Sequence, residues 1–472
     1  MKRKKSPLAV FLSISMAAGL VLSGITSSEA KADTSYNLSP KDNDRDWMTY
    51  EELGQNLEQI EKESDGKVKL GTIGKSRQGR EIYSARVGTG DKVLLVEGNI
   101  HGNEKSGPEA LVQMLEELGT SDSDRAKAVR KGITIVAVPR LNVDGAEIPQ
   151  RQNIFPWDDV VKTYPHLEGA KPAWNYSESN KGFDINRDFN PDLNYEPKKA
   201  DLPGSQADPG FYLTPESRSV RDLFLKLQDE FGEVGAFVDL HHMGTPKLNT
   251  TGEDVTASID YPALGPDNNP KYADWPNLDQ DESRRYALAA ALGMKEFSKH
   301  DEETGIARYI HPEKRDYPGQ ARDSFALNGV PTVLFEMPGQ QPQYGYDQEL
   351  VDRVENGLWG ITTRMADGSV DDLNGDDFFR LPKYWVPSAS DMNTLVERFE
   401  KDGAFKDDKA VHSLKMHLTA IGHYEKEGKT EKVIKHMNGF KSLLDQQKEK
   451  GLISEEAYKR LKSGADELIE WA

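Results

Sequence analysis

The chain has 472 residues, contains no cysteine and carries a formal net charge of −19 at pH 7. This length is too great for one compact core and predicts two or three domains, while the negative charge argues against a nucleic acid partner. Without cysteine the chain can form neither disulfides nor thiolate ligands, so any metal site has to use His, Asp or Glu.

The first 32 residues have the pattern of a secretory signal peptide. They begin with MKRKK, continue through the mostly apolar stretch Leu8–Leu22 and end in Ala30-Lys31-Ala32. A charged start, a short apolar run and small residues at the end mark such a signal, and the run is short for a membrane span. We therefore predict a signal peptide over residues 1–32, a short N-terminal segment over 33–45 and an exported, soluble mature chain.

The next hundred residues predict alternating helices and strands. Residues 46–62 have the spacing of an amphipathic helix, and residues 67–88 read as two strands around a turn. The run VLLVEGNI, residues 93–100, is almost continuously apolar, which is typical of a buried parallel strand. A helix through Leu111 and a strand over residues 133–142 follow.

The middle of the chain continues this alternation after a long irregular segment. Residues 146–215 are polar and rich in Pro, Asn and Asp, and an irregular stretch of that length inside a domain is usually functional. We predict a helix over residues 215–231 before the strand GAFVDLH, a helix over 284–300, and a buried strand over 331–336. The alternation indicates an α/β fold with a mixed, mostly parallel sheet and helices on both faces.

The composition changes near residue 385, where strand patterns end. Val411, Leu414, Leu418 and Ile421 follow helical spacing, and glycines separate the segments. We predict a catalytic domain over residues 46–380 and a small all-α bundle over residues 385–472.

Side chains at the ends of the predicted strands are candidates for a functional site, because ligands of open α/β sheets collect beyond the carboxyl ends of the strands. His101 and Glu104 follow one strand, His241 ends the second, and Glu336 ends the third. His-x-x-Glu alone is weak evidence, but here a buried strand presents it. Together with His241 it would supply the His₂Glu ligand set known from zinc peptidases.

The order of the motifs HGNE (101–104), DINRDF (184–189), DLH (239–241) and LFE (334–336) resembles the zinc metallocarboxypeptidase family, the carboxypeptidase A-like enzymes. GKSRQGREI (74–82) and NVDG (142–145) are also similar to family patterns. The resemblance covers roughly residues 46–365. It implies a carboxypeptidase-like fold, one zinc ion and hydrolysis at peptide C-termini.

The resemblance also implies roles for individual residues. His101, Glu104 and His241 resemble the three zinc ligands, and Asp184 resembles the carboxylate that orients the first histidine. Glu336 resembles the general base. His242 directly follows His241 and is the alternative ligand, but adjacent strand residues face opposite ways.

Substrate contacts follow from the same resemblance. Asn186 and Arg187 resemble the pair that grips the terminal carboxylate, a task that suits a guanidinium. Arg151 is similar to the arginine that polarises the scissile carbonyl. Tyr317 resembles the mobile tyrosine that closes over the substrate, although a two-residue gap separates it from the pattern. Arg322 aligns with the base of the side-chain pocket and would there favour a terminal Glu or Asp.

The C-terminal segment resembles the FIMAH domain of secreted Gram-positive proteins, which brings no settled activity. We therefore predict a secreted zinc carboxypeptidase, from a Gram-positive bacterium, with an accessory bundle that contacts the cell envelope or a protein. Two alternatives stay open: an amidase of the same fold that trims peptidoglycan stem peptides, and a catalytically silent surface-binding protein.

Overall fold

The computed structural model describes residues 46–244, 247–248, 255–262, 264–265, 269–298, 305–309, 316–339, 345–385 and 388–471. The predicted signal peptide (1–32) and the segment 33–45 lie outside the described residues.

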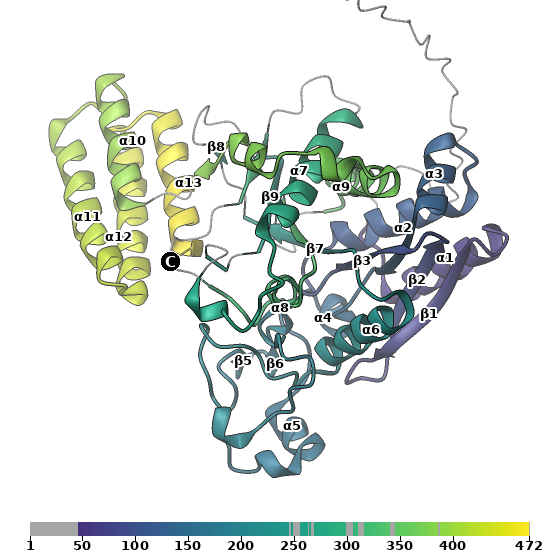
Figure 1. Ribbon diagram of the computed structural model, residues 1–472. Coiled ribbons are helices and arrows are strands. Elements are labelled where there is room, and N and C mark those ends of the chain that lie inside the picture. Colours follow the sequence, from purple (N-terminus) through teal and green to yellow (C-terminus); the bar gives the residue numbers. More distant parts are fainter. Residues whose placement is uncertain are drawn as a thin grey trace, which may run out of the picture. The chain divides into compact units, whose positions relative to one another are not determined.

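An eight-stranded mixed sheet organises the chain before residue 385 (Figure 1). In spatial order its strands are β1 (Val68–Lys75), β2 (Glu81–Gly88), β4 (Ile133–Val138), β3 (Lys92–Gly98), β7 (Ala236–Met243), β11 (Thr332–Pro338), β9 (Ala257–Asp260) and β10 (Ile306–Arg308). The four central strands β4, β3, β7 and β11 are mutually parallel, whereas β1, β2 and β9 introduce the antiparallel pairs. The predicted mixed, mostly parallel sheet is confirmed.

Helices cover both faces of this sheet. Leu94 and Val96 of β3 belong to one hydrophobic core, and Val93 and Leu95 belong to another. Successive strand residues point to opposite faces, so a strand covered on both sides has to be apolar throughout. The first core includes side chains from α1 (Tyr50–Glu63), α2 (Ser106–Thr120), α3 (Asp124–Gly132), α7 (Gln280–Glu296) and α9 (Gln348–Asp367); the second includes side chains from α6 (Pro215–Phe231) and α8 (Ala321–Leu327).

Capping residues set the helix boundaries. The Thr214 side chain accepts a hydrogen bond from the Ser217 amide, and Pro215 occupies the first turn of α6, so the prediction of residues 215–231 is confirmed. Helix α7 instead begins four residues before the predicted start, because Asp279 caps it. The predicted end at residue 300 lies outside the described residues.

The long polar segment after β4 is packed rather than loose. It contains α4 (Val143–Glu147), α5 (Trp157–Thr163) and the hairpin of β5 (Tyr176–Ser177) and β6 (Gly182–Phe183). Side chains of this segment, Phe155, Val160 and Leu167 among them, form a hydrophobic core of their own. Strand β8 (Lys247–Leu248) pairs with β12 (Tyr384–Trp385). Six short 3₁₀ turns of the described chain are Pro165–Leu167, Ile185–Arg187, Lys199–Asp201, Pro270–Tyr272, Ser369–Asp372 and Gly375–Arg380.

Four helices form the C-terminal bundle: α10 (Ala389–Lys401), α11 (Asp408–Lys426), α12 (Thr430–Glu449) and α13 (Glu455–Trp471). Leu414, Leu418 and Ile421 of α11 are buried in a core made of bundle residues alone, together with Met437 and Phe440 of α12. The helical spacing of apolar residues in the sequence thus predicts which side chains form this core.

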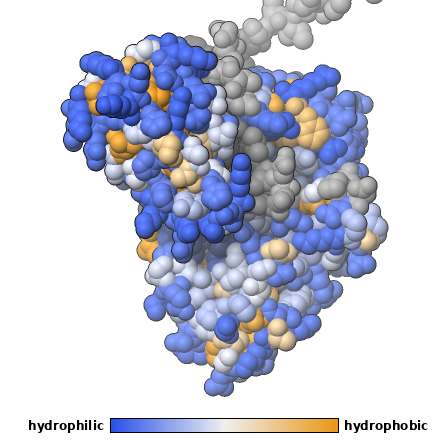
Figure 2. Space-filling model, turned by 90° about the vertical axis from the view of Figure 1, so that its left-hand side faces the viewer, coloured by the Kyte–Doolittle hydropathy of each residue, from blue (hydrophilic) through white to orange (hydrophobic). Residues whose placement is uncertain are grey.

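One face of the molecule is mostly hydrophilic. Figure 2 shows a largely hydrophilic face on which hydrophobic residues form small separate patches. None of the described helices combines the length and the apolar character needed to cross a membrane.

Candidate metal centre

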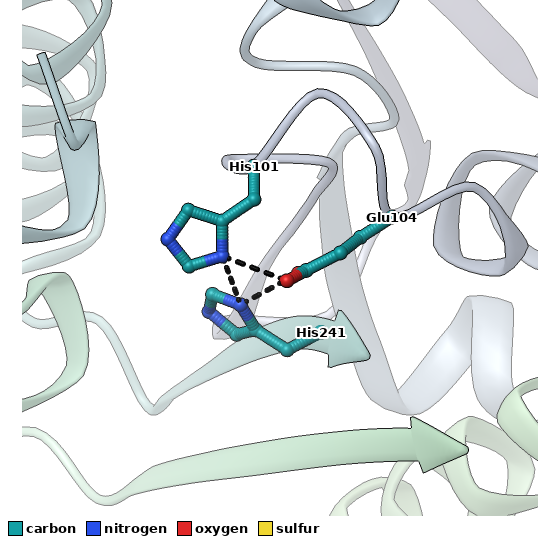
Figure 3. A group of neighbouring side chains, drawn as sticks. All are labelled: His101, Glu104 and His241. Atoms are coloured by element: carbon teal, nitrogen blue, oxygen red, sulfur yellow. Dashed lines mark hydrogen bonds and ion pairs between the residues drawn. The ribbon is translucent and has the colours of Figure 1, made fainter. Parts of the chain in front are cut away.

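The carboxyl ends of β3 and β7 bring His101, Glu104 and His241 together (Figure 3). The Nδ1 atoms of the two histidines lie 3.1 Å apart, and each lies 2.9 Å from one carboxylate oxygen of Glu104. All three side chains are buried. In the part of the chain that the structure describes, this is the one group of His, Asp and Glu whose geometry could hold a metal ion.

The loop after β3 is shaped by Asn99 and Gly102. Asn99 has a φ of 58°, a left-handed conformation that asparagine tolerates better than most residues. Its amide donates hydrogen bonds to the carbonyls of His101 and Glu104 at 2.7 and 2.6 Å. A Cβ atom on Gly102 would lie 2.3 Å from the carbonyl carbon of Gly145, so only glycine fits here. The turn therefore holds His101 and Glu104 on the same side.

The donor set fits a zinc ion. Ligand atoms about 2 Å from a tetrahedral zinc lie about 3.3 Å from one another, close to the separations found here. Two imidazoles and one carboxylate leave a fourth position for a substrate or water. Although burial opposes it, His101 and His241 hold the pKa of Glu104 well below its usual range, so this carboxylate is charged and ready to bind a cation.

Asp184 lies on the outer side of His101, whereas Arg151 extends from Asp184 to the side that faces Glu104, where its Nη1 lies 3.2 Å from Nδ1 of His101. Asp184 lies at the N-cap of the Ile185–Arg187 turn, and its Oδ1 is 3.1 Å from Nε2 of His101. Arg151 donates to Oδ2 of Asp184 through Nε and Nη2, and its Nη1 lies 3.8 Å from Glu104. A carboxylate on Nε2 keeps the proton on that nitrogen and leaves Nδ1 to face the metal position. Asp184 thus lies beside the nitrogen of His101 that points away from Glu104.

Asp239 holds His241 in the same way, and the sequence analysis missed it. Its Oδ2 lies 2.8 Å from Nε2 of His241, and its side chain is fully buried. Burial works against a charged imidazole, but Asp239 and Glu104 together raise the pKa of His241 well above its ordinary value. The signal was available: Asp239 precedes His241 by two residues on one strand, so both side chains lie on the same face.

His242, the alternative ligand, points to the opposite face. Its Nε2 accepts a hydrogen bond from the Ser106 amide at 3.1 Å, and its Nδ1 lies 2.9 Å from the carbonyl of Gly339. These contacts use both ring nitrogens, which leaves His241 as the residue that faces Glu104.

Glu336 lies beside His241 in the sheet, since the two residues are register partners of the parallel strands β11 and β7. Burial and the neighbouring charge of Glu104 together raise the pKa of Glu336 to about 8, against the opposing charges of His241, Arg322 and Arg151. Within the described residues its Oε2 atom has no hydrogen-bond partner. The side chain is half-buried, and a buried carboxylate oxygen without a partner is costly and is a mark of a reactive site.

Asn186 is buried between Asp239 and the loop before α8. Its amide nitrogen lies 3.2 Å from Asp239 and 3.0 Å from Nε2 of His241, while its oxygen accepts a hydrogen bond from the Ala321 amide. With a proton on Nε2, the asparagine amide can donate only to Asp239. Asn186 therefore supports the arrangement of His241, beside the predicted role in gripping a terminal carboxylate.

Arg187 and Tyr317, two of the predicted substrate contacts, lie next to each other. The guanidinium carbon lies 5.0 Å from the centre of the Tyr317 ring, and Nη1 donates to the carbonyl of Asn186. Arg187 forms no ion pair with any described residue, so most of its donors stay available for a carboxylate.

Arg322 is brought near this region but is already paired. It is buried, donates to Asp260 at 2.9 Å and lies 3.7 Å from Asp323. Two neighbouring carboxylates offset its positive charge, a feature that the sequence could not reveal because Asp260 is 62 residues away.

Comparisons with known proteins agree with this geometry. A sequence model described as zinc carboxypeptidase matches residues 53–347, and one described as FIMAH domain matches residues 389–470. Zinc carboxypeptidase A 1 of Anopheles gambiae is 27% identical over 201 residues, which cover 42% of either chain. The carboxypeptidase N catalytic chain of Homo sapiens is 30% identical over 156 residues, 31% of either chain. The chain thus aligns with less than half of the length of these relatives.

Among solved structures, bovine thrombin-activatable fibrinolysis inhibitor in complex with tick carboxypeptidase inhibitor is similar with a TM-score of 0.48 and 16% identity. The match covers 69% of this chain and 98% of that chain.

Proposed function

The chain belongs to the zinc carboxypeptidase family, and from that premise we propose that it hydrolyses the last peptide bond of peptides or protein C-termini. His101, Glu104 and His241 would hold one zinc ion. When bound there, zinc would polarise the scissile carbonyl and make the attacking water more acidic. The observation that carries this proposal is the convergence of three ligand atoms beside Glu336.

Glu336 is the proposed general base. Its carboxylate has a free oxygen within the described residues and lies on the strand next to His241. It takes a proton from the attacking water and returns it to the leaving amine. A cation at the three ligands would favour the charged form of Glu336 and lower its pKa from the value of about 8 found without one.

Arg151 is the proposed partner of the developing oxyanion. Its guanidinium lies at the ligands and is about one third exposed, so it can reach a bound carbonyl. Fixed positive charge at the position where negative charge develops stabilises the transition state. Asp184 would keep Arg151 oriented between substrate molecules.

Exopeptidase selectivity is assigned to Arg187, with Asn186 and Tyr317. A guanidinium binds a carboxylate through two parallel hydrogen bonds, which only a chain terminus offers at this place. Arg322 would favour a terminal Glu or Asp, and the neighbouring carboxylates of Asp260 and Asp323 weaken that preference. An unchanged ratio of rates on peptides ending in Glu and Leu after Arg322→Ala would remove that preference from the proposal.

The experiment is incubation of the mature chain with a mixed peptide pool, followed by mass spectrometry. We expect stepwise loss of C-terminal residues, abolished by a chelator and restored by zinc. Glu336→Gln should lower kcat by about 10³-fold or more while zinc stays bound, and Glu349→Gln, an exposed carboxylate on α9, should not.

The other outcomes separate the alternatives. Zinc binding without trimming of any ordinary peptide, but with cleavage of purified peptidoglycan stem peptides, would replace carboxypeptidase by amidase activity. If the chain neither binds zinc nor cleaves any peptide, the remaining alternative is a surface-binding protein that binds its partner through the bundle.

Export is part of the proposal. Residues 1–32 would be removed as a signal peptide, and the bundle would contact the cell envelope or another protein of a Gram-positive bacterium. N-terminal sequencing of the protein from culture medium tests this: a mature start near residue 33 is expected, and an intact Met1 would contradict it.

A further inference from the structure

A basic cavity lies at the opposite ends of the sheet strands from the metal centre. It has a volume of about 580 Å³, and its lining includes the residues before β3 and at the start of β4. His101 follows the other end of β3. Since β3 has seven residues, the two places are about 20 Å apart along the strand. The cavity is therefore separate from the proposed reaction.

The charge of this cavity is opposite to that of the chain. Its lining contains one acidic side chain, Asp91, and six basic ones: Lys67, Lys69, Arg86, Lys127, Arg130 and Lys131. The whole chain has a net charge of −19, which repels anions in general. A local concentration of cations is what would let an anion approach here.

The basic side chains gather because separate elements present them to one place. Lys69 of β1 and Arg86 of β2 are cross-strand partners, and Lys127, Arg130 and Lys131 share one face of α3 through their spacing of three and four residues. Like charges placed directly opposite each other on paired strands destabilise a sheet. Glu230 offsets the charge of Arg86, and a bound anion would offset that of the lysines.

The two arginines of the cavity each have a carboxylate neighbour. Glu230 accepts two hydrogen bonds from Arg86 at 2.6 and 2.8 Å. Arg130 donates through Nη1 to the carbonyls of Leu118 and Ser121, and its Nη2 lies 3.9 Å from Asp122. The four lysines differ: among the described residues none of Lys67, Lys69, Lys127 and Lys131 has a carboxylate partner. The free charge of the cavity therefore belongs to ammonium groups.

We propose that this cavity binds a compact, multiply charged phosphate anion. Planar carboxylates are recognised best by the guanidinium fork, which is occupied here, whereas lysine binds phosphate as a point charge. A concave site of this volume admits a small ligand, which favours a soluble phosphate compound over a flat membrane surface. The proposal is independent of the peptidase reaction.

The test is isothermal titration calorimetry of the full chain with sodium tripolyphosphate. Binding is expected at low salt and should weaken as the salt concentration rises. The double variant Lys69→Glu/Lys127→Glu should weaken binding by about tenfold or more. Lys171→Glu/Lys226→Glu, a matched pair of exposed lysines outside the cavity, should bind as the unaltered chain does.

Two further binding measurements decide the class of ligand. Citrate, which carries carboxylates, should bind much more weakly than tripolyphosphate, and vesicles containing phosphatidylglycerol should not compete. Equal binding of citrate, binding to vesicles alone, or equal affinity of both double variants would overturn the proposal. The peptidase rate of either variant should stay unchanged, because the cavity lies away from the metal centre.

Discussion

At the scale of single residues, the two histidines of the metal centre are each held by a carboxylate on the nitrogen that faces away from the metal position. Asp184 holds His101 and Asp239 holds His241, at 3.1 and 2.8 Å. Such contacts fix the tautomer and the ring orientation. The site is thus organised before any cation arrives.

We expect Asp239→Asn to lower zinc affinity by about 10–100-fold, because the amide no longer favours a proton on Nε2 of His241. Competition with a chromophoric chelator measures this on the folded protein without any substrate. Asp229→Asn, an exposed position on α6, is the control. Equal affinity of the two variants would assign Asp239 a packing role alone.

Glu216 predicts a pH dependence of stability. Burial raises its pKa from 4.5 to about 7, and Asn153 is its side-chain partner. Because the folded state binds the proton more tightly, the stability linked to Glu216 is fully present below pH 4.5 and is lost as the pH rises to about 7.

Glu216→Gln should therefore be more stable than the unaltered chain at pH 8, by up to about 3 kcal/mol, and equally stable at pH 4. Denaturant unfolding at both pH values checks this, with the exposed Glu233→Gln as control. A gain of the same size at pH 4 and pH 8 would show that the effect does not come from ionisation.

At the scale of elements, Arg322 links α8 to the end of β9 through its buried ion pair with Asp260. Removing one partner of a buried pair leaves an uncompensated charge. Arg322→Ala should lower the free energy of unfolding by about 3–5 kcal/mol, as measured by urea denaturation. The double variant Arg322→Met/Asp260→Leu should recover much of that loss; if it is as unstable as the single variant, the ion pair is not the cause.

At the scale of the whole molecule, the bundle has a core of its own residues, which favours independent folding. A chain ending at Trp385 keeps β12 and its pairing with β8. We expect this chain to retain kcat/KM on small peptides within about twofold, and the fragment 388–472 to unfold cooperatively by circular dichroism. Loss of turnover on truncation would instead show that the bundle takes part in catalysis.

The sequence alone determined the fold class and indicated three candidate metal ligands. Strands covered on both faces are apolar at most positions, so their ends could be predicted from the run 93–100 and from GAFVDLH. His101, Glu104 and His241 stand at those ends, where parallel strands converge. The order of the motifs predicted the family. The match of the zinc carboxypeptidase sequence model to residues 53–347 established it.

Tertiary structure alone decided which charges meet. Asp260 offsets Arg322 from 62 residues away, and only the folded structure shows that Oδ2 of Asp239 lies 2.8 Å from Nε2 of His241. The basic cavity joins side chains from β1, β2 and α3 that no local pattern connects. The periodicity of apolar residues in the sequence predicts which residues are buried, because buried positions recur at regular intervals along one helix or strand. Electrostatic partners are set by distances between elements, and these exist only once the chain has folded.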